Sequence, residues 1–439
     1  MRLTVEKLIY GGDGLARLPA DEHGRGKAAF LPFVAPGEQV EAELVEDKPG
    51  FARARAREIV APAPERITPA CPYFTRCGGC HYQHLGYEAQ LAAKVEILRE
   101  TLRRTAKLEW SAEIRAHASP PWEYRNRTRL RVRTAPEFAL GYNRFGSSEL
   151  EPVEKCPISS PLVQRGIGVM WELGRAGRVR EGIREIEFFA DTDDARMLVT
   201  LLADARIETP AEADGSLAEA MRSALPSVVG VVVAPARPVS ADPWEASDAP
   251  PSAVFGAAAL ACTVRGREYH VGAGSFFQTN RFLAGTLVET ALKDRRGALA
   301  FDLYAGVGLF TAPLAAQFER VVAVESSTAA CRDLRHNAPA NVKWRETTAA
   351  EFLERATARP DFIIADPPRA GLGEKVARAL GELAAPRLTY VSCDPATLSR
   401  DLRLLLESGY RVEEVSVLDL FPQTFHIESV VQLVFVKGL

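Results

Sequence analysis

The last third of the chain alternates short apolar runs, typical of buried β-strands, with segments of helical periodicity. No other feature restricts the fold as strongly. Seven runs are predicted to be strands: 299–304, 320–325, 342–345, 361–365, 388–392, 411–418 and 427–436. Helical patterns separate the first six, which indicates a doubly wound α/β fold around a parallel sheet. The last two runs are joined by a short connection and are therefore expected to pair antiparallel.

The 439 residues allow two to four domains. Residues 1–60 alternate β-type runs with glycine-rich turns, which predicts a small OB-like β-barrel. A barrel of this kind suits RNA binding, and a β-module for protein contacts is the alternative. Residues 61–265 are predicted to form an α+β central domain, and residues 266–439 the nucleotide-type α/β domain.

The composition indicates in which cellular compartment the protein is expected. The N-terminus is too polar for a signal peptide, and no apolar run reaches the length of a membrane span. The chain carries seven cysteines, an odd number that favours a reducing compartment and metal or catalytic roles over disulfides. We therefore expect a cytoplasmic protein without a membrane partner. Because the net charge is only −3, any basic surface must be local.

Three cysteines lie close together after a proline-rich linker: Cys71, Cys77 and Cys80. Three thiolates need a fourth ligand, for which Cys156 is the candidate. Four sulfur ligands suit an iron–sulfur cluster or zinc. His81 and His84 keep a mixed Cys/His zinc site open.

Arginine recurs at every second position of one stretch: Arg125, Arg127, Arg129, Arg131 and Arg133. In a strand this period places all five guanidinium groups on one face. Five like charges repel unless an anion lies against them, and guanidinium pairs well with phosphate. The stretch is predicted to face RNA; the alternative is a face paired with acids on a neighbouring strand.

Three reactive side chains are expected at the carboxyl edge of the parallel sheet, where ligands of open α/β sheets bind. Asp366 and Cys393 directly follow two of its strands. Glu428 begins the antiparallel last strand and so returns to the same edge. Gly306 and Gly308 follow the first strand, and Glu325 ends the second, where an acid can bind ribose hydroxyls. Without a pyrophosphate cradle, S-adenosylmethionine is the favoured cofactor.

A thiol, an acid and a methyl donor suit methylation of carbon 5 of uridine. A thiolate that adds to carbon 6 makes carbon 5 nucleophilic toward a methyl sulfonium. A base then removes the carbon-5 proton, and the thiolate leaves. In this hypothesis Cys393 is the nucleophile and Glu428 the base.

Motifs along nearly the whole chain resemble those of the RNA uridine-5-methyltransferase family. They are Cys71, Cys77–Cys80, Tyr124–Arg127, Phe276–Gln278, Asp302–Gly308, Asp366–Arg369, Ser392–Pro395, Phe421–Thr424, His426 and Glu428. The best match is the branch with a TRAM barrel and a [4Fe–4S] cluster that acts on 23S ribosomal RNA. The resemblance implies an N-terminal TRAM domain, a central iron–sulfur domain and a C-terminal S-adenosylmethionine-dependent methyltransferase domain.

The resemblance also implies site roles. Gln278, Tyr304, Glu325 and Asp366 would bind S-adenosylmethionine, and Cys71, Cys77, Cys80 and Cys156 would bind the [4Fe–4S] cluster. The expected partner is RNA, most of all 23S ribosomal RNA, bound by a monomer. A transfer-RNA methyltransferase is the nearest alternative, and an iron–sulfur oxidoreductase or a non-catalytic RNA-binding protein is more remote.

Overall fold

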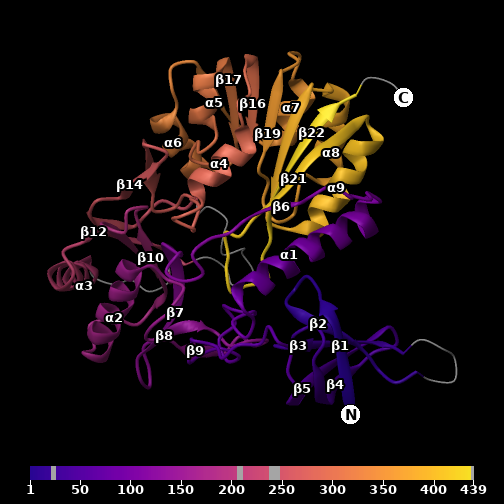
Figure 1. Cartoon of the computed structure of the whole chain (residues 1–439). Helices are drawn as coiled ribbons and strands as arrows, with labels where there is room; N and C mark the ends of the chain where they lie inside the picture. Colours follow the sequence, from indigo (N-terminus) through magenta and orange to yellow (C-terminus); the bar gives the residue numbers. More distant parts are fainter. Residues whose placement is uncertain (21–25, 205–210, 237–247, 437–439) are drawn as a thin grey trace.

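The computed structural model describes residues 1–20, 26–204, 211–236 and 248–436. Along the chain, a barrel at the N-terminus is followed by a central sheet and then by a doubly wound sheet (Figure 1). Across these ranges, no helix combines the length and apolar character that crossing a membrane requires. A surface loop predicted at residues 235–252 falls mostly on 237–247, which lie outside the described residues.

The predicted N-terminal barrel is confirmed, and it is closed in the order β1-β2-β3-β5-β4. Its strands are β1 (Arg2–Leu8), β2 (Asp13–Arg17), β3 (Ala28–Pro32), β4 (Gln39–Asp47) and β5 (Phe51–Ala61). Buried and exposed residues alternate along the first part of β1, so Leu3 and Val5 point into the barrel core, whereas a register shift after Val5 turns Leu8 toward the core of the α/β domain. Closure leaves no long unpaired strand edge on this small domain.

One long helix connects the barrel with the rest of the chain. Residues 86–107 are predicted as a single amphipathic helix, and α1 (Tyr87–Thr101) continues into a π-helical turn, η1 (Leu102–Ala106). Lys107 ends the helix in a left-handed conformation (φ 56°). The predicted apolar stripe is core, since Leu98 and Leu102 are fully buried.

The central sheet has the strand order β13-β12-β11-β10-β7-β8-β9. Its strands are β7 (Arg127–Arg133), β8 (Ala139–Asn143), β9 (Leu150–Pro152), β10 (Ile183–Ala190), β11 (Met197–Ala203), β12 (Val228–Pro235) and β13 (Ala253–Gly256). Helices α2 (Pro161–Arg175) and α3 (Ala211–Ala224) pack together against it (Figure 1). A separate hairpin, β14 (Ala259–Val264) and β15 (Arg267–Gly272), follows.

The doubly wound sheet has the order β18-β17-β16-β19-β20-β22-β21-β6. Its strands are β6 (Arg115–His117), β16 (Gly297–Leu303), β17 (Phe318–Glu325), β18 (Val342–Glu346), β19 (Phe362–Ala365), β20 (Arg387–Ser392), β21 (Tyr410–Leu418) and β22 (Glu428–Phe435). All seven predicted strands are present, and β22 lies antiparallel to both β20 and β21, as predicted. Edge strand β6 comes from the first third of the chain and was not predicted.

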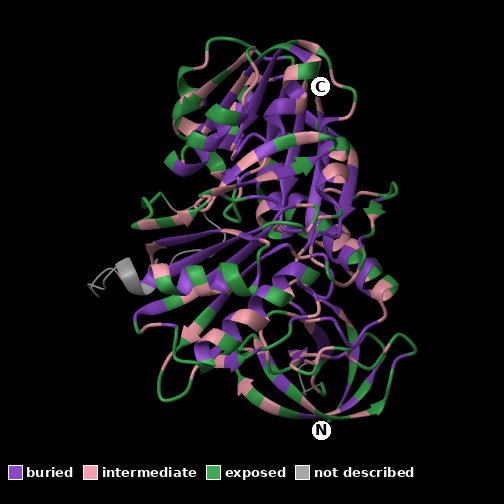
Figure 2. Cartoon of the chain, turned by 90° about the vertical axis from the view of Figure 1, so that its left-hand side faces the viewer, coloured by how far each residue is buried: buried purple, intermediate pink, exposed green. Residues whose placement is uncertain are grey.

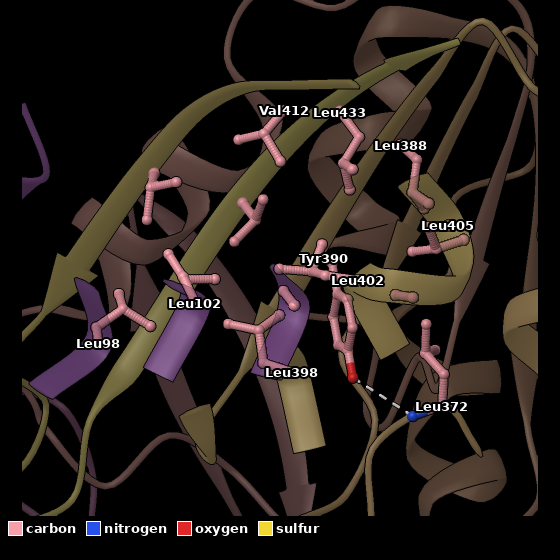
Figure 3. Close-up of a cluster of buried hydrophobic side chains, with 14 of the residues drawn as sticks. Leu98, Leu102, Leu372, Leu388, Tyr390, Leu398, Leu402, Leu405, Val412 and Leu433 are labelled. Atoms are coloured by element: carbon pink, nitrogen blue, oxygen red, sulfur yellow. Dashed lines mark hydrogen bonds between the residues drawn. The ribbon is translucent and has the colours of Figure 1, made fainter. Parts of the chain in front are cut away.

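Helices and apolar side chains cover both faces of this sheet. The helices are α4 (Ala284–Leu292), α5 (Thr311–Gln317), α6 (Thr328–Asn337), α7 (Ala349–Arg355), α8 (Gly373–Leu383) and α9 (Pro395–Glu407). On one face, Leu98 of α1 and Leu102 of η1 join Leu398 and Leu402 of α9 (Figure 3). Figure 2 shows that strands are mostly buried, whereas many helices expose their outer side.

The division into three domains stays a prediction. The hairpin β14–β15 spans the predicted boundary after residue 265, because its two strands pair across the turn. Strand β6 lies in the segment assigned to the central domain, yet it pairs with β21 of the doubly wound sheet.

Candidate active site

The three predicted reactive residues lie at one edge of the doubly wound sheet. Strands β19 and β20 are parallel neighbours, and Asp366 and Cys393 directly follow them. On the other side of β20, Ser392 pairs with Ser429 of antiparallel β22. One further step along this ladder brings Cys393 beside Glu428. The strand order, rather than proximity in sequence, therefore gathers a thiol and two carboxyl groups.

Burial raises the pKa values of all three groups, and charge repulsion adds to the rise for Cys393 and Glu428. Burial raises the pKa of the Cys393 thiol, and the carboxylates of Glu428 and Asp366 raise it further. Burial and the charge of Asp366 also raise the pKa of Glu428 well above its usual value. The pKa of Asp366 rises to about 7 because its surroundings exclude water. A cationic ligand at this edge would relieve these repulsions.

A glycine-containing turn after β16 leaves open space at the same edge of the doubly wound sheet. Tyr304, Gly306 and Gly308 have positive φ angles of 63°, 55° and 95°. A Cβ atom on Gly306 would meet nothing within 4 Å, whereas one on Gly308 would lie 2.9 Å from Cδ1 of Leu334. Glu325 accepts a 2.8 Å hydrogen bond from the Gly306 amide. The turn therefore leaves open space beside the acid that was predicted to bind ribose.

Asp302 is a further candidate that the sequence prediction missed, although it lies within a quoted motif. Its side chain is fully buried, and its pKa rises to about 7 mainly through burial. Oδ2 accepts a hydrogen bond from Thr311, but Oδ1 has no partner among the described residues. An unpaired buried carboxylate oxygen beside the open turn fits a site for a polar or cationic cofactor group.

Gln278 lies on a loop that the arginine strand holds in place. Arg127 donates hydrogen bonds to the carbonyl oxygens of Ser275 and Ala273. Gln278 itself is buried, at 7% exposure. Arg127 of the central sheet therefore fixes the loop that carries Gln278, one of the four predicted cofactor-binding residues.

The arginine stretch divides into two parts. Arg127 is buried against Glu187 at 2.6 Å, and Arg129 contacts Glu187 at 3.1 Å, so acids of β10 face both. This is the alternative that the sequence left open. Arg131 and Arg133 are exposed. Arg125 is partly buried and donates to the Arg127 carbonyl oxygen. Contact with RNA stays a prediction and concerns chiefly the exposed pair.

The four predicted cysteine ligands line one cleft, and all four are free thiols. The pKa of Cys77 rises to about 12, chiefly through burial and in smaller part through the nearby Cys156 and Cys71 thiols. Within the described residues, no three His, Cys, Asp or Glu side chains close around a single metal-ion position. Four cysteines that line one cleft are the type of donor that iron–sulfur and zinc centres use, and a bound cluster stays a prediction.

The two histidines beside the cysteines have other contacts. His84 Nε2 lies 3.1 Å from the Val34 carbonyl oxygen of the barrel. The His81 ring packs edge-on against Phe425 at 4.6 Å. Burial lowers the pKa of each histidine to about 4, so both are neutral near pH 7.

A cleft of about 1610 Å³ is lined by the four cysteines and by residues of the arginine strand. Its lining includes the side chains of Arg125, Arg127, Arg129 and Arg131 and reaches Thr424 and His426. His426 is two residues before Glu428. The cleft therefore runs past the arginine strand to the loop before Glu428, and Asp366, Cys393 and Glu428 themselves are not among its lining residues.

Polar residues of α1 hold the loop that precedes Glu428, a role that sequence periodicity did not reveal. Lys94 is fully buried and bonds Asp419 at 2.6 Å and the Phe421 carbonyl oxygen at 2.9 Å. Gln90 and Gln423 exchange hydrogen bonds of 3.0 and 2.9 Å. The backbone amides of His81 and Tyr82 donate to the Gln423 carbonyl oxygen. The loop is thus fixed both by α1 and by the cysteine segment.

The start of helix α7 lies after β18, next to the strand that ends in Glu325. Ala349 and Ala350 begin α7, and Glu351 closes a capping box with Thr348 at its N-terminus. Glu351 therefore has a structural partner in its own helix.

Comparison with known proteins identifies relatives over almost the full length. The profile of the tRNA (uracil-5-)-methyltransferase family matches residues 86–436, and that of the TRAM domain matches residues 1–56. An uncharacterized RNA methyltransferase of Streptomyces avermitilis is 33% identical over 98% of this chain and 96% of its own. The 23S rRNA (uracil(1939)-C(5))-methyltransferase RlmD of Pseudomonas putida is 30% identical over 98% and 92%.

A solved structure supports the fold. The tRNA (uracil-54, C5)-methyltransferase of Pyrococcus abyssi, in complex with S-adenosyl-L-homocysteine, superposes with a TM-score of 0.75 and 23% identity. The match covers 99% of this chain and 100% of that chain. The barrel, the central sheet and the α/β sheet therefore occur together in a known methyltransferase architecture.

Proposed function

The chain belongs to the tRNA (uracil-5-)-methyltransferase family, and on that basis we propose that it methylates carbon 5 of one uridine in 23S ribosomal RNA through a covalent adduct of Cys393. The chain is an RNA (uracil-5-)methyltransferase of class EC 2.1.1 with an S-adenosylmethionine-dependent methyltransferase fold. The observation that carries the mechanism is the pairing of β20 with β22, which brings a thiol beside a carboxyl group.

In this mechanism the Cys393 thiolate adds to carbon 6 of the uracil ring, and carbon 5 gains nucleophilic character. Bound S-adenosylmethionine supplies the methyl group that carbon 5 takes up. The Glu428 carboxylate then removes the proton from carbon 5, the electron pair re-forms the carbon 5–carbon 6 double bond, and the thiolate leaves. Cys393 thus returns to its thiolate form, and Glu428 ends the reaction with one added proton.

We assign cofactor binding to four residues around the glycine turn and its neighbouring loop: Gln278, Tyr304, Glu325 and Asp366. Glu325 suits ribose hydroxyls because a carboxylate oxygen that already accepts one hydrogen bond can accept another. Asp366 suits a cationic group, since positive charge nearby would lower its raised pKa.

We further propose that Cys71, Cys77, Cys80 and Cys156 hold a [4Fe–4S] cluster, with zinc as the lesser alternative. The cluster would supply structural order to the segment whose His81 and Tyr82 amides hold the loop before Glu428. No step of the reaction involves it.

Ribosomal RNA is preferred over transfer RNA because a relative named for 23S rRNA aligns with 98% of the chain at 30% identity. The family description and the Pyrococcus abyssi structure, both named for tRNA, support the second candidate. Mass spectrometry of 23S rRNA and tRNA from cells lacking the gene tests both. Loss of 5-methyluridine from 23S rRNA alone is the expected result, and loss from tRNA alone would contradict the proposal.

The covalent step has its own test. RNA that carries 5-fluorouridine cannot lose a proton from carbon 5, so the adduct should persist as a denaturation-resistant protein–RNA complex. Wild-type protein should form this complex in the presence of S-adenosylmethionine, and Cys393→Ala should not. Cys262→Ala is the matched control, because Cys262 is buried in the strand β14. A complex formed by Cys393→Ala would refute the assignment.

A further inference from the structure

The N-terminal barrel contacts the residue next to the proposed nucleophile. Tyr10 lies in the connection between β1 and β2, and its hydroxyl group donates a 3.0 Å hydrogen bond to Oδ2 of Asp394, 384 positions away in sequence. Asp394 directly follows Cys393, and its Oδ1 caps α9 by accepting from the Ala396 and Thr397 amides. One carboxylate therefore joins the barrel, the start of α9 and the nucleophile segment.

Tyr10 also reaches the other two segments that carry reactive residues. Its ring packs edge-on against Phe425, with centroids 5.5 Å apart, and Phe425 lies three residues before Glu428. Its hydroxyl group interacts with the guanidinium group of Arg369, three residues after Asp366. A single barrel side chain thus touches the segments of all three reactive residues.

Simple docking of the barrel does not account for this hydroxyl group. Other contacts already attach the barrel to the body, among them the Lys7–Glu100 ion pair with α1 at 2.5 Å. Glu38 of the barrel is fully buried and bonds Arg66, beyond the last barrel strand. The Tyr10 hydroxyl group instead has its partners beside the reactive edge.

Given the proposed function, we propose that Tyr10 is a positioning residue for the methylation reaction. Through its hydroxyl group the barrel holds Asp394 and Arg369 in the arrangement that favours the Cys393 thiolate. The barrel is then a structural part of the active site in addition to any contact it makes with RNA.

Electrostatics gives the direction of the expected effect. Burial raises the pKa of the Cys393 thiol most, the Arg369 guanidinium lowers it, and the Asp394 carboxylate raises it. The hydrogen bond from Tyr10 spreads the negative charge of Asp394, and the same hydroxyl group keeps Arg369 close. Removing the hydroxyl group weakens both effects, and each change raises the pKa of the thiol.

Alkylation of Cys393 in the full-length protein tests the proposal. The rate at which iodoacetamide modifies the Cys393 peptide is followed by mass spectrometry between pH 7 and 10. In Tyr10→Phe, which keeps the ring against Phe425, we expect alkylation at pH 8 to be about three- to tenfold slower and the profile to move to higher pH. The thiolate fraction falls tenfold for each unit by which the thiol pKa rises.

Two further variants make the result specific. Lys7→Met removes a different contact between barrel and body and should leave the alkylation profile unchanged. In an Asp394→Asn background, where the side chain can still cap α9, Tyr10→Phe should have a smaller effect than in wild type. In methyl transfer, Tyr10→Phe should lower kcat with little change in KM for RNA.

A Tyr10→Phe profile that superposes on wild type would overturn the proposal. The same shift in Lys7→Met would also overturn it, since the effect would then come from general docking. The alkylation assay contains neither RNA nor cofactor, so its outcome does not depend on whether 23S rRNA is the substrate. Failure of the proposed function and failure of this inference can therefore be told apart.

Discussion

At the scale of single residues, the reactive edge combines a thiol and two carboxyl groups whose charged forms are disfavoured by burial. The pKa of Glu428 and that of Cys393 are both raised, and the carboxylate of Asp366 contributes to each. The proposed mechanism requires Cys393 and Glu428 without their protons. The raised pKa values oppose the loss of these protons, so ligand charge and pH should control the activity of the site.

The first prediction concerns pH. Because both essential groups must lose a proton and both have raised pKa values, the single-turnover rate of methyl transfer should rise steadily from pH 6 to 9. The slope should reach about tenfold per pH unit where one proton limits the rate. Asp366→Asn, measured at saturating cofactor, should move the rise to lower pH because it removes one of the charges that raise both pKa values. A rate that falls across this range would contradict the assignment.

The second prediction separates the nucleophile from the base. Glu428→Gln keeps the size of the side chain but cannot accept the proton from carbon 5. A methylated adduct should therefore accumulate on Cys393 with unmodified RNA, and release of free 5-methyluridine RNA should fall by about 10²–10⁴-fold. Denaturing gel electrophoresis with radiolabelled RNA measures both. The double variant Cys393→Ala, Glu428→Gln is the control and should form no complex; normal turnover by Glu428→Gln would exclude it as the base.

At the scale of elements, strand β7 has a structural end and an exposed end. Arg127 is buried in an ion pair with Glu187 and holds the loop of Gln278 through the carbonyl oxygens of Ser275 and Ala273. Arg131 is exposed and bonds Asn143 and Ser148 near the surface. A periodic arginine pattern in the sequence therefore serves two purposes along one strand.

The third prediction uses this division. Arg127→Ala removes the closer of the two arginines that pair with buried Glu187 and leaves Arg129 at 3.1 Å, so the free energy of unfolding should fall by up to about 3–5 kcal/mol, and cofactor binding should weaken. Arg131→Ala should change stability by less than about 1 kcal/mol. If the Arg131 side chain contacts phosphate, Arg131→Ala should also change the salt dependence of RNA binding. The slope of the logarithm of the RNA-binding constant against the logarithm of the salt concentration should decrease by about one. Urea denaturation and RNA binding at several salt concentrations measure both; equal losses of stability would contradict this division.

At the scale of the whole molecule, segments far apart in sequence meet around the reactive edge. The barrel reaches it through Tyr10, α1 through Lys94 and Gln90, and the cysteine segment through the amides of His81 and Tyr82. Loss of order in any of these segments should therefore affect Glu428 or Cys393. The cluster proposed for the cysteines would act on the reaction through this structural connection.

The fourth prediction concerns those cysteines. Cys156→Ala should reduce the iron and sulfide content of protein purified without oxygen, along with cluster absorbance near ~400 nm. It should also lower the melting temperature. Cys262→Ala, at a buried cysteine outside the group, should keep the full iron content. Reduction of the wild-type protein by dithionite should leave methyl transfer unchanged if the cluster is structural. A strict dependence of turnover on its oxidation state would contradict the structural role.

The doubly wound sheet could be predicted strand by strand, because buried parallel strands form apolar runs that differ clearly from the helices between them. The same pattern predicted that Asp366, Cys393 and Glu428 meet at one edge, since strand ends in such a sheet share an edge. The barrel was equally clear from its alternation and turns. In these parts local sequence and global fold point to the same answer.

Only the tertiary structure decided which distant residues support that edge. Lys94 and Gln90 occupy a helix that periodicity describes only as amphipathic, and their partners lie more than 300 residues away. The contact of Tyr10 with Asp394 and the pairing of Arg127 with Glu187 likewise arise because separate segments of the chain pack together. Sequence periodicity determines the face on which a side chain lies, whereas the partner on that face depends on how separate segments pack. For this reason the meeting of Asp366, Cys393 and Glu428 at one edge could be predicted from the chain, and the contacts that hold that edge in place could not.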